Sequence, residues 1–437
     1  MCENPERRSF LQMGISLSAT FALSRLLGSG RAAAMAGEDF PVQRKLIWIH
    51  MRGGWDLLET VDPKTQSTSK LDMTYDYGLA QTLAGATEDV RLGRWWSKTA
   101  QLGQEIVLVR GLAMGTTSHD AGSVYSDTGV LSNSGNVNAA SIPAIVASQS
   151  GATIPLIQLN GADTPKTDRG LLKPVSVVRA GELSLYQGLF PQNSTDSDAS
   201  KRILEYSRLS LLRLQDAAGT NDRLTAAEAA RSKIQGQIDS AVGSKLSLSA
   251  ADRAPFLSAL DEDTRNQAGG TVDSFALAVK LLKNDLVTCV NMGVGNFDTH
   301  SNQERNLMPL LTNFDSLFST LISQLKMAGL LDQTLIVLYS DFGRTPKVNN
   351  MAGRDHWPVG GALIAGGGIA GGRAVGATDA DLLAKNVDPA TGLANDGGIQ
   401  LSPVHLGGSV LELTLGAGYL SKRPYLVSIP SLTRLKS

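Results

Sequence analysis

Short apolar runs recur along the chain and predict buried β-strands. They cover residues Lys45–Met51, Glu105–Arg110, Ile154–Leu159, Leu286–Met292 and Thr334–Ser340. Later in the chain, leucine and phenylalanine recur at helical spacing, which predicts helices over Asp273–Lys283 and Gln303–Gly329, the second ended by its glycine. Buried strands that alternate with long helices indicate an α/β fold with a mostly parallel central sheet.

One internal segment departs from this alternation. Residues 190–270 are rich in Ala, Leu, Arg, Asp and Gln, and their apolar positions follow helical spacing with almost no strand pattern. We therefore predict a helical insertion within a single α/β domain that spans residues 37–437.

The first 36 residues have the three parts of an export signal. Arg7 and Arg8 precede the weakly apolar stretch Met13–Leu27, and small residues at 34–36 form an A-x-A cleavage site. The apolar stretch is too short and too rich in Ser and Gly for a stable membrane span. We predict a twin-arginine signal peptide, contact with the twin-arginine export machinery, and a periplasmic or secreted protein; an ordinary amphipathic helix is the alternative.

Composition narrows the functional classes. The chain has 437 residues, 42% of them hydrophobic, and a formal charge of −1, so no basic field favours nucleic acid. Cys2 lies in the predicted signal peptide, which leaves Cys289 inside an apolar run. A lone cysteine in such a run is typical of a buried hydrophobic residue rather than a nucleophile.

Acidic and imidazole groups follow several of the predicted strands. Only five histidines occur in the chain, and the polar candidates cluster in three short motifs and one upstream loop: Asp298 and His300, Asp341, His356, and Asp56. Residues at i and i+2 of an extended segment point to one face, so Asp298 and His300 can reach one ion. We predict a site for one or two divalent ions (zinc, manganese or calcium) at the strand ends. Helix caps and surface histidines are the alternative.

The motifs F-D-T-H, S-D-F-G-R-T-P and G-R-D-H-W-P, with the earlier R-G-G-x-D, also resemble a known family. They are similar to an exported bacterial family called "domain of unknown function 1501", which looks like a member of the alkaline phosphatase/sulfatase superfamily. The resemblance covers essentially residues 37–437 and is most specific over 45–60 and 296–375. It implies a three-layer sandwich and a metal-dependent hydrolase of phosphate or sulfate esters.

The resemblance also implies roles for individual residues. Asp56, Asp298, His300, Asp341 and His356 match metal ligands. The nucleophile region falls on residues 116–119, where Ser118 and Thr117 are the hydroxyl candidates. Phe342 stands where active enzymes carry a His or Asn ligand, and His119 is the candidate replacement; otherwise the site holds one metal or has lost turnover.

Two arginines are candidate anion clamps. Arg344 and Arg354 could bind phosphate or sulfate oxygens through their planar forks, or they could form surface ion pairs. The predicted function is an exported metal-dependent hydrolase of a small or polymeric anionic ester. The alternative is a non-catalytic envelope protein on the same scaffold, which binds an anionic ligand or a protein partner.

Overall fold

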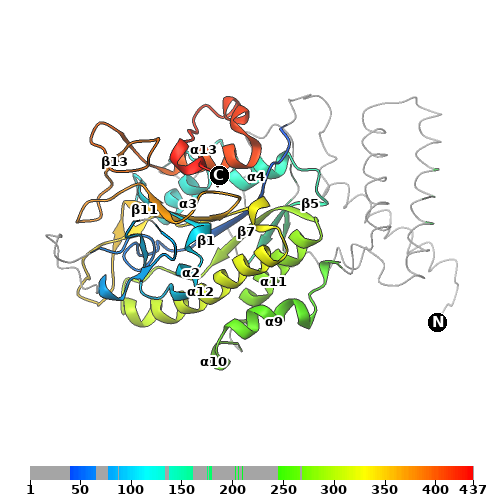
Figure 1. The fold of residues 1–437 in the computed structure, drawn as a ribbon, viewed down its shortest axis with the longest axis horizontal. Coiled ribbons are helices and arrows are strands. Elements are labelled where there is room, and N and C mark those ends of the chain that lie inside the picture. Colours follow the sequence, from blue (N-terminus) through cyan, green and yellow to red (C-terminus); the bar gives the residue numbers. More distant parts are fainter. Residues whose placement is uncertain are drawn as a thin grey trace, which may run out of the picture.

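The computed structural model describes residues 40–64, 77–86, 88–132, 137–160, 175, 177–179, 202, 205, 209, 245–265 and 268–436 (Figure 1). The predicted signal peptide and most of the predicted helical insertion lie outside the described residues. Within the insertion, the described part from 245 onward contains two helices, α9 (Ala250–Ala259) and α10 (Glu262–Arg265).

A central eight-stranded sheet organises the described chain, with the order β12-β4-β11-β8-β1-β7-β5-β6. The strands are β1 (Lys45–Met51), β4 (Ile106–Ala113), β5 (Ile154–Leu159), β6 (Val177–Arg179), β7 (Val287–Val294), β8 (Thr334–Tyr339), β11 (Val359–Gly366) and β12 (Arg373–Val375). All neighbours pair in parallel except β11, which is antiparallel to both β4 and β8. The predicted mostly parallel α/β sheet is therefore confirmed.

Alternation along the central strands divides the core into two layers of side chains. In β1, Ile47, Ile49 and Met51 pack into one hydrophobic cluster, whereas Leu46 and Trp48 pack into the other. Period-two alternation on a strand buried on both faces requires exactly this division of a continuous apolar run.

Helices cover both faces and make a three-layer sandwich (Figure 1). Helices α11 (Gly269–Lys283) and α12 (Gln303–Met327) supply the first cluster, and α4 (Ile142–Ser148) and α13 (Pro403–Leu415) supply the second. Helix α3 (His119–Thr128) contacts α13 and α4 on that second side. Among the described residues, no helix has the length and apolar character needed to span a membrane.

The sheet brings the polar motifs to one edge. Strands β1, β7 and β8 are parallel, so the loops that follow them begin at the same carboxyl edge. The antiparallel β11 begins at that edge, and the small ladder of β9 (Gly343–Arg344) and β10 (His356–Trp357) precedes it. Its reversed direction explains why His356 arrives beside residues that follow the parallel strands.

Candidate metal centre

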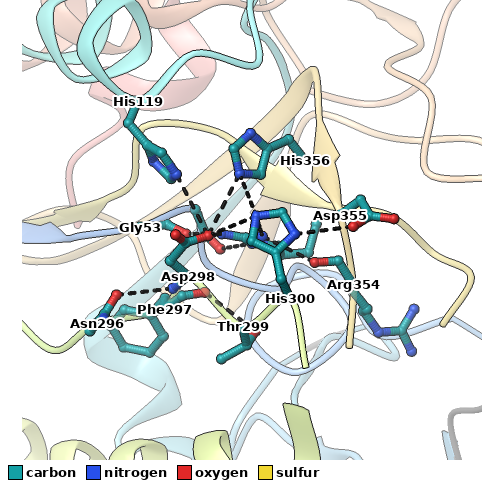
Figure 2. A network of polar contacts seen from close by, with 12 residues as sticks. Gly53, His119, Asn296, Phe297, Asp298, Thr299, His300, Arg354, Asp355 and His356 are labelled. Carbon is teal, nitrogen blue, oxygen red and sulfur yellow. Dashed lines mark hydrogen bonds and ion pairs between the residues drawn. The ribbon is translucent and has the colours of Figure 1, made fainter. Parts of the chain in front are cut away.

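Three histidines converge on one carboxylate oxygen at this edge (Figure 2). The Nε2 atoms of His119 and His356 each lie 3.6 Å from Asp298 Oδ1, and Nε2 of His300 lies 3.1 Å from it. The Nε2 atoms of His300 and His356 are 2.9 Å apart. The structure therefore brings together Asp298, His300 and His356, and adds His119 from the start of α3.

The other ring nitrogen of each histidine determines its tautomer. Each Nδ1 meets an oxygen that can only accept: the Asp341 carboxylate for His119, the Asp355 carboxylate at 3.1 Å for His300, and the Thr117 carbonyl at 2.7 Å for His356. Nδ1 must carry the proton in each case, so a neutral ring presents the Nε2 lone pair to the centre. Metal-binding histidines are oriented in the same way, by donating their second N–H to a carboxylate or carbonyl.

This donor set fits a divalent cation. Ligand atoms around one zinc ion lie about 3.3 Å apart. His119, Asp298 and His356 each offer a ligand atom, and these atoms all lie within 4.8 Å of one another. His300 Nε2 lies 3.1 Å from Asp298 Oδ1 and 2.9 Å from His356 Nε2. Three lone pairs and a carboxylate oxygen repel one another unless a cation or protons lie between them. The side chains are 25–45% exposed, so water or substrate can reach the centre.

Local charges tune the members of this cluster. Partial burial alone would raise the pKa of the Asp298 carboxyl, but the hydrogen bond and charge of Arg344 hold it below its ordinary value. The hydrogen bond to Asp341 raises the pKa of the His119 imidazole, whereas burial lowers the pKa of His356. Asp298 is therefore ionised, and burial favours the neutral form of His356.

Asp341 orients His119 instead of facing the centre. One of its oxygens accepts N–H bonds from Gly53 at 3.2 Å and Gly54 at 2.7 Å and an O–H bond from Ser340 at 2.9 Å, and the other accepts from His119. Burial would raise the pKa of Asp341, yet the bond from His119 helps hold it far below its ordinary value. The two glycines can donate side by side because they have φ values of +101° and +74°. We expected Asp341 to be a ligand; the structure gives its oxygens these other partners.

Asp56 also lies outside the cluster. Its carboxylate is 1% exposed and accepts hydrogen bonds from the Leu58 amide at 2.8 Å and from the Gln303 side chain. It also forms an ion pair with Arg354, whose Nε lies 3.0 Å from Oδ2. Arg354 also donates to two backbone carbonyls, of Thr345 and Pro346. The expected ligand Asp56 and the expected anion clamp Arg354 therefore form a buried pair with each other.

Arg344 is likewise saturated. Its side chain is fully buried, and its N–H groups point to five acceptors: Gly54 O at 2.9 Å, Arg354 O at 3.0 Å, His300 Nε2 at 3.3 Å, Asp298 Oδ1 at 2.5 Å, and Gly53 O. In place of a free fork for a substrate anion, the structure shows a guanidinium that holds Asp298 and the Gly53-Gly54 turn.

The expected hydroxyl nucleophiles take no part in the cluster. Ser118 is the N-cap of α3 and Thr117 contributes only its carbonyl; in the described part of the chain, neither hydroxyl is hydrogen-bonded to a base. The Phe342 ring packs against two histidines of the cluster, with its centroid 4.7 Å from that of His119 and 4.4 Å from that of His356. His119 therefore reaches the centre from the start of α3, with its ring against that of Phe342.

Sequence reasoning missed Asp355 as a partner of His300. The motif G-R-D-H-W-P could have indicated this contact, because adjacent side chains of an extended segment point in opposite directions. Asp355 and His356 contact the cluster from two sides in this way (Figure 2). Cys289 is buried, as the sequence predicted. His50 is buried in β1, and His405 lies in the first turn of α13.

Fold and site together define an α/β protein with a candidate divalent-metal centre at the carboxyl edge of its sheet. The chain belongs to the family described as "Protein of unknown function (DUF1501)", whose model matches residues 43–391. No match was found among curated proteins.

Several solved structures are similar to the chain, among them three bacterial proteins. A PsFucS1 sulfatase from Pseudoalteromonas sp. is 12% identical, with 99% of this chain and 76% of the other covered and a TM-score of 0.36. The lipoteichoic acid synthase LtaP from Listeria monocytogenes is 11% identical over 91% and 78%, with a TM-score of 0.35. A protein in the alkaline phosphatase superfamily from Vibrio parahaemolyticus is 9% identical over 94% and 77%, with a TM-score of 0.32.

Proposed function

We propose that the protein is a metal-dependent hydrolase of phosphate or sulfate esters. The observation that supports the proposal is the convergence of three oriented Nε2 atoms on Asp298 Oδ1. His119, His300, His356 and Asp298 would hold the ion, and Asp341, Asp355 and the Thr117 carbonyl would fix the three rings. This set includes Asp298, His300 and His356, as expected from sequence, and His119, which the sequence suggested as the replacement for the ligand lost at Phe342. It does not include Asp56 or Asp341.

A bound divalent cation would supply Lewis-acid chemistry: it would withdraw charge from an ester oxygen and acidify a bound water. Nitrogen-rich coordination favours zinc over manganese and calcium, which suit oxygen ligands better. Every other contribution comes from the chain, which orients the rings and keeps Asp298 ionised through Arg344.

The start of α3 supports an anionic substrate. His119 is the first residue of this ten-residue helix, so the unpaired N–H groups and positive dipole end of the helix lie beside the centre. An ester anion, small or polymeric, would be stabilised there. Hydrolysis would add water across the ester bond, with a hydroxyl passing to phosphorus or sulfur and a proton to the leaving alcohol.

Export remains part of the proposal through residues 1–36. The twin-arginine pattern supports delivery of the folded, metal-loaded chain to the periplasm or beyond.

A second candidate function is anion binding without turnover. It is favoured by two observations: neither Thr117 nor Ser118 is hydrogen-bonded to a base among the described residues, and Arg344 has no free donor for a transition-state oxygen. Such a protein would bind inorganic phosphate or sulfate at the metal and release it unchanged.

The test uses the exported protein loaded separately with zinc, manganese and calcium. Phosphate monoesters, phosphate diesters and sulfate esters are assayed with the native chain and with His356→Ala and His405→Gln. His405 lies in the first turn of α13, where its ring contacts Ser402 and, in the part of the chain that the structure describes, no residue of the cluster, and it serves as the histidine control. The hydrolase predicts turnover that falls by about 100-fold or more in His356→Ala and is unchanged in the control.

Two other results separate the candidates. Metal and inorganic phosphate binding without hydrolysis of any ester would favour the second function. Absence of metal binding would contradict both.

A further inference from the structure

A permanent positive charge lies against the candidate metal centre. Arg344 is fully buried, with Nη2 at 2.5 Å from Asp298 Oδ1 and Nη1 at 3.3 Å from His300 Nε2. These are two of the atoms that would bind the ion. Arginine does not lose its proton in proteins, so this charge is present at every working pH.

We propose that Arg344 acts as a built-in cation that limits the centre to a single divalent ion. This inference rests on the proposed metal centre and adds its stoichiometry and the role of the arginine. The guanidinium lies against Asp298 Oδ1, and its charge repels any second ion placed beside that oxygen.

The neighbouring carboxylates support one ion as well. Paired metal sites hold two ions about 3.5–4 Å apart between shared and flanking ligands. Asp341 and Asp56 are the buried carboxylates next to the centre, and both are saturated by N–H and O–H donors. A second ion would have to displace those donors from a buried carboxylate, which leaves them unsatisfied.

The bound ion and Arg344 would share Asp298 Oδ1, so the arginine should affect the affinity of the centre for the ion. In the native chain the bound ion and Arg344 compete for the same oxygen, and their charges repel. Replacing the arginine by a neutral side chain removes the competitor and the repulsion, so the ion should bind more tightly. A purely structural arginine predicts the reverse, because losing its five hydrogen bonds would loosen the ligands.

The experiment compares Arg344→Gln, which removes the charge, with Arg344→Lys, which keeps it. Arg94→Gln is the control, because Arg94 is an arginine that forms ion pairs with Glu59 and Glu304, although it is only partly buried. Zinc stoichiometry is measured by metal analysis, and the dissociation constant by competition with a chelator. Circular dichroism and thermal melting check that each variant is folded.

We expect one zinc per native chain, and binding by Arg344→Gln that is about tenfold or more tighter than by Arg344→Lys. The control should match the native affinity. Two zinc ions per native chain, or an equal loss of affinity in both Arg344 variants, would overturn the inference. If the glutamine variant does not fold, the native stoichiometry and the lysine variant decide: two ions, or a lysine variant that has lost binding, overturn it.

These outcomes are distinct from failure of the proposed function. If no metal binds, the proposed metal centre itself is contradicted. If one ion binds but no ester is hydrolysed, the hydrolase function is contradicted and the role of Arg344 still stands.

Discussion

Asp341→Asn should weaken metal binding by reversing the tautomer of His119. Three donors, from Gly53, Gly54 and Ser340, point at one oxygen of Asp341. An asparagine must keep its oxygen on that side, because its NH2 group would otherwise face three donors. Its NH2 group then faces His119 Nδ1, which must accept, so the proton moves to Nε2 and the lone pair is lost from the centre.

The size of the effect follows from what is lost. Partners that orient a metal-binding histidine are typically worth about 10–100-fold in metal affinity, or about 1.4–2.7 kcal/mol. Asp341 is 2% exposed, so water cannot take its place, and the effect should lie at the upper end of this range. Asp355 provides the comparison: it is 57% exposed beside His300, and water can replace it in Asp355→Asn.

The assay pairs affinity with tautomer. Chelator competition gives the zinc dissociation constant, and nitrogen-15 NMR of the histidine side chains shows which ring nitrogen of His119 carries the proton. We expect a loss near 100-fold for Asp341→Asn, with Nε2 protonated, and a loss of less than about tenfold for Asp355→Asn. Unchanged affinity in Asp341→Asn, or a His119 that keeps its proton on Nδ1, would refute the reasoning.

Three further predictions test the surroundings of the centre. Asp56→Ala should lower the free energy of unfolding by about 3–5 kcal/mol, because it leaves Arg354 buried without its ion-pair partner. The zinc stoichiometry should not change, and loss of zinc from a folded variant would contradict the assignment of Asp56 as a partner of Arg354 and not a metal ligand. Gly54→Ala should lower the melting temperature, since a Cβ there would lie 2.6 Å from the Phe342 ring at a φ of +74°, and a native melting curve would count against it. Zinc affinity should fall as the pH drops through the raised pKa of His119, because protons and metal compete for Nε2. The expected loss is about tenfold per pH unit for each displaced proton. Titration calorimetry across pH checks this, and a flat profile between pH 5 and 8 would be inconsistent with histidine ligands.

Local periodicity was enough to predict the main elements of the fold. Strands β1 and β5 have the predicted bounds, and α12 begins at Gln303 as expected and ends two residues before Gly329. Each is long or strongly apolar, so local pattern and tertiary environment agree. Strand β11 escaped prediction because its glycines and alanines have low strand propensity, and its antiparallel direction depends on which strands it lies between.

For the candidate site too, some residues could be predicted from the local sequence and others could not. The spacing of Asp298 and His300 predicted that both could reach one ion, and the structure brings them together. Asp56 could not be judged from its neighbours, because its partner Arg354 follows far along the chain. The distinction between Asp341 as a ligand and as a support for His119 depends on the Gly53-Gly54 turn, which no local pattern reveals.

The most direct test of the centre is anomalous X-ray diffraction from crystals of the protein soaked in zinc, recorded on both sides of the zinc absorption edge. The account predicts one strong anomalous peak, about 2.0–2.2 Å from Asp298 Oδ1 and from the Nε2 atoms of His119, His300 and His356. A peak bound by the carboxylates of Asp56 or Asp341, or no peak near Asp298, would contradict it.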